Sequence, residues 1–167
     1  MKVLIIEDEE PFVKEVRKLL QREGYETIEA TTVEQAQQKL TQQGQQRISI
    51  ALVDMRLRTE REAGLKLIEL MRKESPWIVP IVLTGYAEVS NVGKCMRAGA
   101  FQYLCKDVCC DELLLMTVKQ AADQFSLLTA VYELLKQCDQ LQACISGVGT
   151  CTSNVRKIAR GLEDKFE

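Results

Sequence analysis

The chain has 167 residues, of which 28% are charged, with a formal net charge of -2 and a pI near 5.4. This length can bury one sizeable core plus an appendage, and the weak negative charge excludes nucleic-acid binding by bulk electrostatics. No apolar run approaches the about 18 residues that a membrane span needs, and the N-terminus enters directly as a strand rather than as a signal peptide. We therefore expect a cytoplasmic protein without membrane or nucleic-acid partners.

The cysteines and the absence of histidine restrict the chemistry further. The chain contains seven cysteines, an odd number with no Cys-x-x-Cys pair, and no histidine. A zinc site therefore lacks both its usual spacing and its usual imidazole ligands, and we expect reduced, mostly buried thiols. The lack of histidine also excludes an imidazole base or a phosphohistidine on this chain.

Two buried apolar segments each end on acidic residues. Residues 48–53 (ISIALV) predict a strand buried on both faces of a parallel sheet, and Asp54 follows directly. Residues 3–6 predict a second such strand, which is followed by Glu7 and Asp8. An isolated Asp after a strand more often caps the next element, but parallel strands bring these three acids to one sheet edge. Clustered carboxylates repel unless a cation joins them, and oxygen ligands suit magnesium.

The remaining pattern alternates strands with helices. Apolar spacing predicts helices at about 11–23, 33–40, 65–71 and 89–98, and strands at 25–30, 77–83 and 100–105. Together these form five β-α units. They predict an α/β fold with a doubly wound, five-stranded parallel sheet in the order 2-1-3-4-5.

A hydroxyl and a lysine end the last two predicted strands. Thr84 closes the fourth strand and Lys106 follows the fifth. A Thr-Gly pair alone usually marks a turn, but here it reaches the same edge as the acids. Asp54 offers a nucleophilic carboxylate, while Thr84 and Lys106 can bind the oxygens of a transferred phosphoryl group.

Four segments in order resemble the receiver domain of two-component response regulators. These are residues 6–9 (IEDE), 52–57 (LVDMRL), 83–87 (LTGYA) and 98–106 (AGAFQYLCK). The resemblance covers residues 1–122 and implies a flavodoxin-like receiver domain that signals and is not an enzyme.

The resemblance implies that Asp54 accepts a phosphoryl group from a phosphohistidine of a partner histidine kinase or phosphotransfer protein. It also implies a Mg²⁺ ion held by Asp54, Asp8, Glu7 and the backbone carbonyl of Arg56. No other cofactor is implied.

The resemblance further implies a switch at the neighbouring strands. Thr84 would bind the phosphoryl oxygens, Lys106 would pair with them, and Tyr103 would turn into the space that Thr84 leaves. The family usually has proline after this lysine, and the cis peptide bond before that proline orients the lysine side chain. In this chain Asp107 replaces the proline. Because a cis bond without proline is costly, we expect a trans bond, a less fixed Lys106, and competition from Asp107 for its ammonium group.

Residues 123–167 predict a helical extension. No Gly or Pro interrupts residues 111–145, so the fifth helix should run on for roughly 50 Å. It either packs back on its own domain or dimerises, and we favour a homodimer through these C-terminal helices. After a break at 146–150, residues 153–166 predict a short amphipathic helix, which leaves no room for a DNA-binding output domain. The heptad seam consists of Leu114, Val118, Ala121, Phe125, Leu128, Tyr132 and Leu135.

Three classes of function remain open. The first is a phosphorylatable receiver that signals through dimerisation or partner docking. The second is a degenerate receiver, a dimeric interaction module that ignores phosphorylation; the chain could also be the truncated N-terminal part of a larger regulator. The third is an enzyme on the same sheet, which is disfavoured because Glu7 and Asp8 would repel a flavin phosphate and Arg56 replaces the acid of aspartate-dependent phosphatases.

Overall fold

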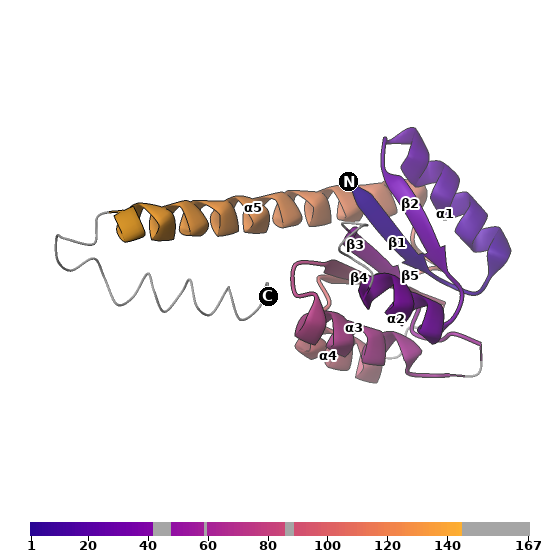
Figure 1. The fold of residues 1–167 in the computed structure, drawn as a ribbon. Coiled ribbons are helices and arrows are strands. Elements are labelled where there is room, and N and C mark those ends of the chain that lie inside the picture. Colours follow the sequence, from indigo (N-terminus) through magenta and orange to yellow (C-terminus); the bar gives the residue numbers. More distant parts are fainter. Residues whose placement is uncertain (42–47, 59, 86–88, 145–167) are drawn as a thin grey trace.

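Five parallel strands form one sheet in the order β2-β1-β3-β4-β5, as predicted (Figure 1). Figure 1 shows the computed structural model, which describes residues 1–41, 48–58, 60–85 and 89–144. All six residues of β3 are buried, which confirms that this strand is covered on both faces. The strands are β1 (Lys2–Ile6), β2 (Glu26–Ala30), β3 (Ile48–Val53), β4 (Val79–Thr84) and β5 (Gln102–Cys105).

The helices cover both faces of the sheet, so the predicted doubly wound architecture is confirmed. On one face α1 and α5 pack with alternate residues of the central strands, such as Ile5, Leu52 and Ile81. On the other face α2 and α3 pack with the intervening residues, such as Ile6 and Val53, and α4 adds a smaller cluster. The helices are α1 (Glu10–Arg22), α2 (Val33–Thr41), α3 (Ala63–Glu74), α4 (Val89–Ala98) and α5 (Asp111–Cys144).

The strand register aligns the carboxyl ends of the central strands. Ile6 pairs with Val53, which in turn pairs with Val82. The residues that follow β1 and β3 therefore leave the sheet side by side. At the other side of β4, Thr84 is the register partner of Cys105, so the residue after β5 reaches the same edge.

Helix α5 has two parts, one packed on the domain and one that projects from it. Leu114, Val118 and Ala121 belong to the buried core, so the first part of the predicted seam packs on its own domain rather than on a partner. Beyond this part the helix projects away from the sheet (Figure 1). There Leu127 is 66% exposed and Leu134 is 61% exposed.

Some expectations need correction or lie outside the described part. The cysteines whose surroundings the structure describes are free, but only one of these five is buried, so the expectation of mostly buried thiols is wrong; they are Cys95 (buried), Cys105, Cys109, Cys110 and Cys138. The short helix predicted at 153–166 lies outside the described residues. Within the described residues, no helix combines the length and the apolar character needed to span a membrane.

Candidate functional site

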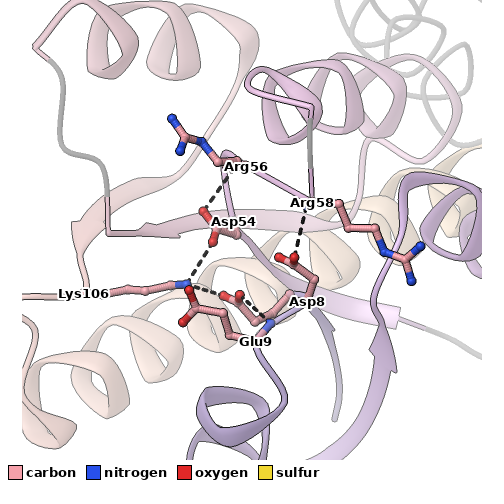
Figure 2. Close-up of polar contacts among 7 residues, drawn as sticks. Asp8, Glu9, Asp54, Arg56, Arg58 and Lys106 are labelled. Atoms are coloured by element: carbon pink, nitrogen blue, oxygen red, sulfur yellow. Dashed lines mark hydrogen bonds and ion pairs between the residues drawn. The ribbon is translucent and has the colours of Figure 1, made fainter.

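Asp54 is held at the carboxyl end of β3 by backbone contacts on two sides. Its N–H donates to the carbonyl of Ile6, 2.9 Å away, and the backbone N–H of Arg56 donates to its Oδ1 at 3.2 Å (Figure 2). Behind it, a Cβ added to Gly64 at the start of α3 would lie 2.5 Å from the carbonyl oxygen of Asp54. Asp54 is only 7% exposed, so its carboxylate is fixed within the sheet edge.

Glu7 and Asp8 bring further carboxylate oxygens to Asp54. One oxygen from each of the three lies within 4.8 Å of the others. Asp8 is oriented by the backbone N–H of Arg58, which donates to its Oδ2 at 3.1 Å, and Arg58 has a left-handed φ of 54° (Figure 2). A compact set of hard oxygen donors with a net negative charge fits Mg²⁺.

Lys106 lies between two of these acids. Its Nζ is 2.8 Å from Oδ2 of Asp54 and 2.5 Å from Oε2 of Glu7 (Figure 2). The same ammonium group lies 4.5 Å from the centre of the Phe12 ring. The side chain of Lys106 is only 11% exposed.

The expected trans bond after Lys106 is found, since the described residues contain no cis peptide bond. The expectation that Lys106 is less fixed does not match this arrangement, because two carboxylates and an aromatic ring surround its ammonium group. Asp107 is exposed, and the ion pairs of Lys106 are with Glu7 and Asp54.

Burial and charge shift two ionisable groups of the site. Burial raises the pKa of Glu7 to about 7, against the opposing effect of its hydrogen bond from Lys106. Burial alone would lower the pKa of Lys106, but its hydrogen bonds and charge interactions with Asp54 and Glu7 raise it overall. Lys106 therefore stays a cation at neutral pH, while Glu7 titrates close to neutrality.

Thr84 and Tyr103 lie beside this cluster. Thr84 is fully buried, and its backbone carbonyl accepts a hydrogen bond from the N–H of Lys106 at 2.9 Å. Tyr103 is half-buried and packs against the cluster that contains Met55 and Cys95. The predicted residues thus gather at one edge, with Tyr103 on the face covered by α4.

Three contributors were missed by the sequence reasoning. Phe12 falls within the helix predicted at about 11–23 and carries no further signal in the sequence, although α1 begins at the edge where the acids lie. Arg58 acts through its backbone N–H, which no residue pattern reveals. Gly64 lies ten residues after Asp54 in sequence, and its contact with the backbone depends on how α3 approaches the sheet.

Comparison with known proteins identifies the family of this domain. Residues 3–118 match the response regulator receiver domain family. The chain is 28% identical over 163 residues to the alginate biosynthesis transcriptional regulatory protein AlgB of Pseudomonas aeruginosa, covering 95% of this chain and 35% of that protein. It is 32% identical to the photosynthetic apparatus regulatory protein RegA of Cereibacter sphaeroides, covering 66% of this chain and 58% of that protein.

Solved structures give the same result. A CheY-like receiver domain protein from Methanospirillum hungatei matches with a TM-score of 0.64 and 28% identity, covering 74% of this chain and 94% of that one. The fold of NtrX from Brucella abortus matches with a TM-score of 0.71 at 20% identity, covering 97% of this chain and 34% of that one. The chain spans 25 to 35% of the length of the first curated relatives that it matches. By its sequence and its fold, the chain belongs to the response regulator receiver family.

Proposed function

We propose that Asp54 accepts a phosphoryl group from a phosphohistidine of a partner histidine kinase or phosphotransfer protein. The observation that carries this proposal is the placement of the Asp54 carboxylate, which lies at the sheet edge with one oxygen on the Lys106 ammonium. In the transfer, the bond between phosphorus and the histidine nitrogen breaks and a bond to a carboxylate oxygen of Asp54 forms. Lys106 is charged and close enough to balance the negative charge of the phosphoryl oxygens.

The proposal includes a Mg²⁺ ion held by Glu7, Asp8, Asp54 and the backbone carbonyl of Arg56. When bound, this ion would neutralise negative charge on the phosphoryl oxygens. The three carboxylates supply a compact oxygen set, which supports the assignment. Asp8 is the most accessible of the three acids, so we assign it the contact nearest to solvent.

We assign the switch to Thr84 and Tyr103. Phosphorylation adds more than one negative charge and several acceptor oxygens at Asp54, which favours an approach of the Thr84 hydroxyl. Thr84 closes the strand next to β3, and Tyr103 lies on the strand beyond it. A movement of Thr84 would therefore change the space available to the Tyr103 ring.

The output that we propose is a change in a homodimer formed through α5, or docking of a partner protein. Leu127, Val131 and Leu134 are 66%, 39% and 61% exposed, and they recur at spacings of four and three. This stripe has the period of a coiled-coil seam, and a helix that projects from its domain needs such packing for stability. We place the protein in the cytoplasm, as a signalling module without catalytic turnover of its own.

Two alternatives make different predictions. A degenerate receiver would dimerise equally with and without a phosphoryl donor. The N-terminal part of a larger regulator would accept the phosphoryl group but require further residues for its output, an alternative supported by the greater length of its curated relatives.

The test is intact mass after incubation with acetyl phosphate, with and without Mg²⁺. We expect one phosphoryl group added, dependent on Mg²⁺, and lost in Asp54→Asn. Asp107→Asn is the matched control, because it changes an exposed acid next to Lys106 and should leave the uptake intact. Failure of the unchanged protein to gain mass, under conditions that label a known receiver, would contradict the proposal.

A further inference from the structure

Phe12 occupies an unusual place beside the proposed phosphoacceptor. It lies in the first turn of α1, and its half-buried ring has the Lys106 ammonium 4.5 Å from its centre. We propose that Phe12 is a positioning residue, whose ring face holds the ammonium group of Lys106 against Asp54. This inference rests on the proposed role of Asp54 and concerns how the lysine is kept at that site.

The chemistry of the contact favours a ring over any other apolar side chain. The face of an aromatic ring carries partial negative charge and attracts a cation. Lys106 is 11% exposed, so its ammonium group has lost most of its water and needs electrostatic partners. Glu7 and Asp54 supply two of these partners, and the ring supplies a third that adds no formal charge to a site already rich in acids.

The surrounding cavities show what the ring prevents. A small cavity beneath Asp54 and an open groove between α1 and the start of α5 are both lined by Phe12. The groove is also lined by Lys106 and by two acids, Glu15 and Asp111. Without the ring, the flexible lysine side chain would have both the space and the competing carboxylates to leave Asp54.

The backbone near Lys106 does not provide this restraint by itself. The N–H of Lys106 is fixed to the carbonyl of Thr84, 2.9 Å away, which places its Cα at the sheet edge. Four methylene carbons, joined by rotatable bonds, separate that backbone from the ammonium group. The position of the charge is therefore decided at the tip of the side chain, where the Phe12 ring lies.

The test compares Phe12→Leu with Phe12→Tyr. In the NMR spectrum of the unchanged protein, we expect the ε-methylene protons of Lys106 to be shifted upfield by the ring. The shift should persist in Phe12→Tyr and disappear in Phe12→Leu. We expect the rate of phosphorylation by acetyl phosphate to fall about 3- to 30-fold in Phe12→Leu, the range of a desolvated cation–π contact, and to be restored in Phe12→Tyr.

Phe101→Leu is the matched control, since this half-buried ring packs on the same core as Phe12. Phe101 precedes β5, whereas Lys106 follows it. It should leave both readouts unchanged. If Phe12→Leu does not fold, ring-fluorinated phenylalanine at position 12 keeps the shape while weakening the negative ring face, and the rate should fall as fluorines are added.

Two results would overturn the inference: an unshifted Lys106 signal in the unchanged protein, or equal rates for the Leu and Tyr variants. If the unchanged protein takes up no phosphoryl group, the proposed function fails, and the Lys106 signal still decides whether the ring holds the lysine.

Discussion

The carboxyl edge of the sheet and the outer part of α5 are organised in opposite ways. At the edge, Asp54 and the Lys106 side chain are 7% and 11% exposed, and the charges face one another within a single chain. On outer α5, Leu127 and Leu134 are 66% and 61% exposed. The site is thus assembled by the fold itself, whereas the helix presents apolar surface that its own domain does not cover. Chemistry and assembly should therefore respond to different substitutions.

The largest effect on stability should come from removing the cation at the edge. Lys106→Met leaves Glu7 and Asp54 buried without their partner, and we expect the free energy of unfolding to fall by about 3 to 5 kcal/mol. Lys136→Met, on the exposed side of outer α5, should change it by less than about 0.5 kcal/mol. Urea unfolding measures both. Equal effects would remove the distinction between the two regions.

The next effect concerns the tight packing behind Asp54. In Gly64→Ala the added Cβ would lie 2.5 Å from a backbone oxygen, so backbone atoms must move. We expect a loss of about 3 kcal/mol, together with slower phosphorylation. Gly85→Ala is the control, because its added Cβ meets nothing within 4 Å. A stable, active Gly64→Ala protein would show that the backbone behind Asp54 can move to accommodate the added methyl group.

A comparable effect should appear as pH dependence. Because the pKa of Glu7 is about 7 in the folded protein, against an ordinary value of 4.5 for a glutamate, the folded state binds more protons between these values. Its contribution is thus most favourable at low pH and is lost as pH rises from about 4.5 to 7. Glu7→Gln should remove this decline, on the order of 3 kcal/mol, measured by urea unfolding at several pH values.

Glu10→Gln is the control for that series, since the pKa of this exposed carboxyl is lowered by its hydrogen bond from Lys14. The Glu10→Gln protein keeps Glu7, so its stability should decline with pH as that of the unchanged chain does. A Glu7→Gln protein with the same pH profile as the unchanged chain would contradict the raised pKa of Glu7.

The smallest effect on domain stability should come from a substitution in outer α5. The same substitution should abolish dimerisation. Leu134→Glu places a charge on the exposed apolar stripe, and we expect unfolding of the domain to change by less than about 0.5 kcal/mol. Sedimentation should show a dimer for the unchanged chain and a monomer for the variant. Glu133→Gln, one residue away, should remain dimeric. A monomeric unchanged chain would contradict the proposed homodimer.

Local patterns were sufficient to predict the strands, the helices and the cluster at the sheet edge, whereas the strand order depended in part on the resemblance to receiver domains. Apolar runs such as 48–53 locate the strands, and in a parallel sheet the residues after such strands must meet. The long fifth helix followed equally from the absence of Gly and Pro, and α5 is continuous from Asp111 to Cys144, the last residue that the structure describes.

Other features depend on angles and approaches that no local pattern encodes. The predicted seam on α5 treated Leu114 and Leu135 alike, but only the first is within the core, because the domain ends part-way along the helix. Likewise, the ring of Phe12 reaches Lys106 only because of how α1 lies on the sheet. Such contacts join residues far apart in the chain through the packing of whole elements.

Helix α5 also has a mechanical consequence. It starts five residues after Lys106 and continues unbroken for 34 residues, a length of about 50 Å. A stiff rod of this length amplifies motion at its base: a tilt of about 5° would displace its far end sideways by about 4 Å. A rearrangement near Lys106 that is too small to disturb the core could thus appear as a sideways displacement at the far end of α5.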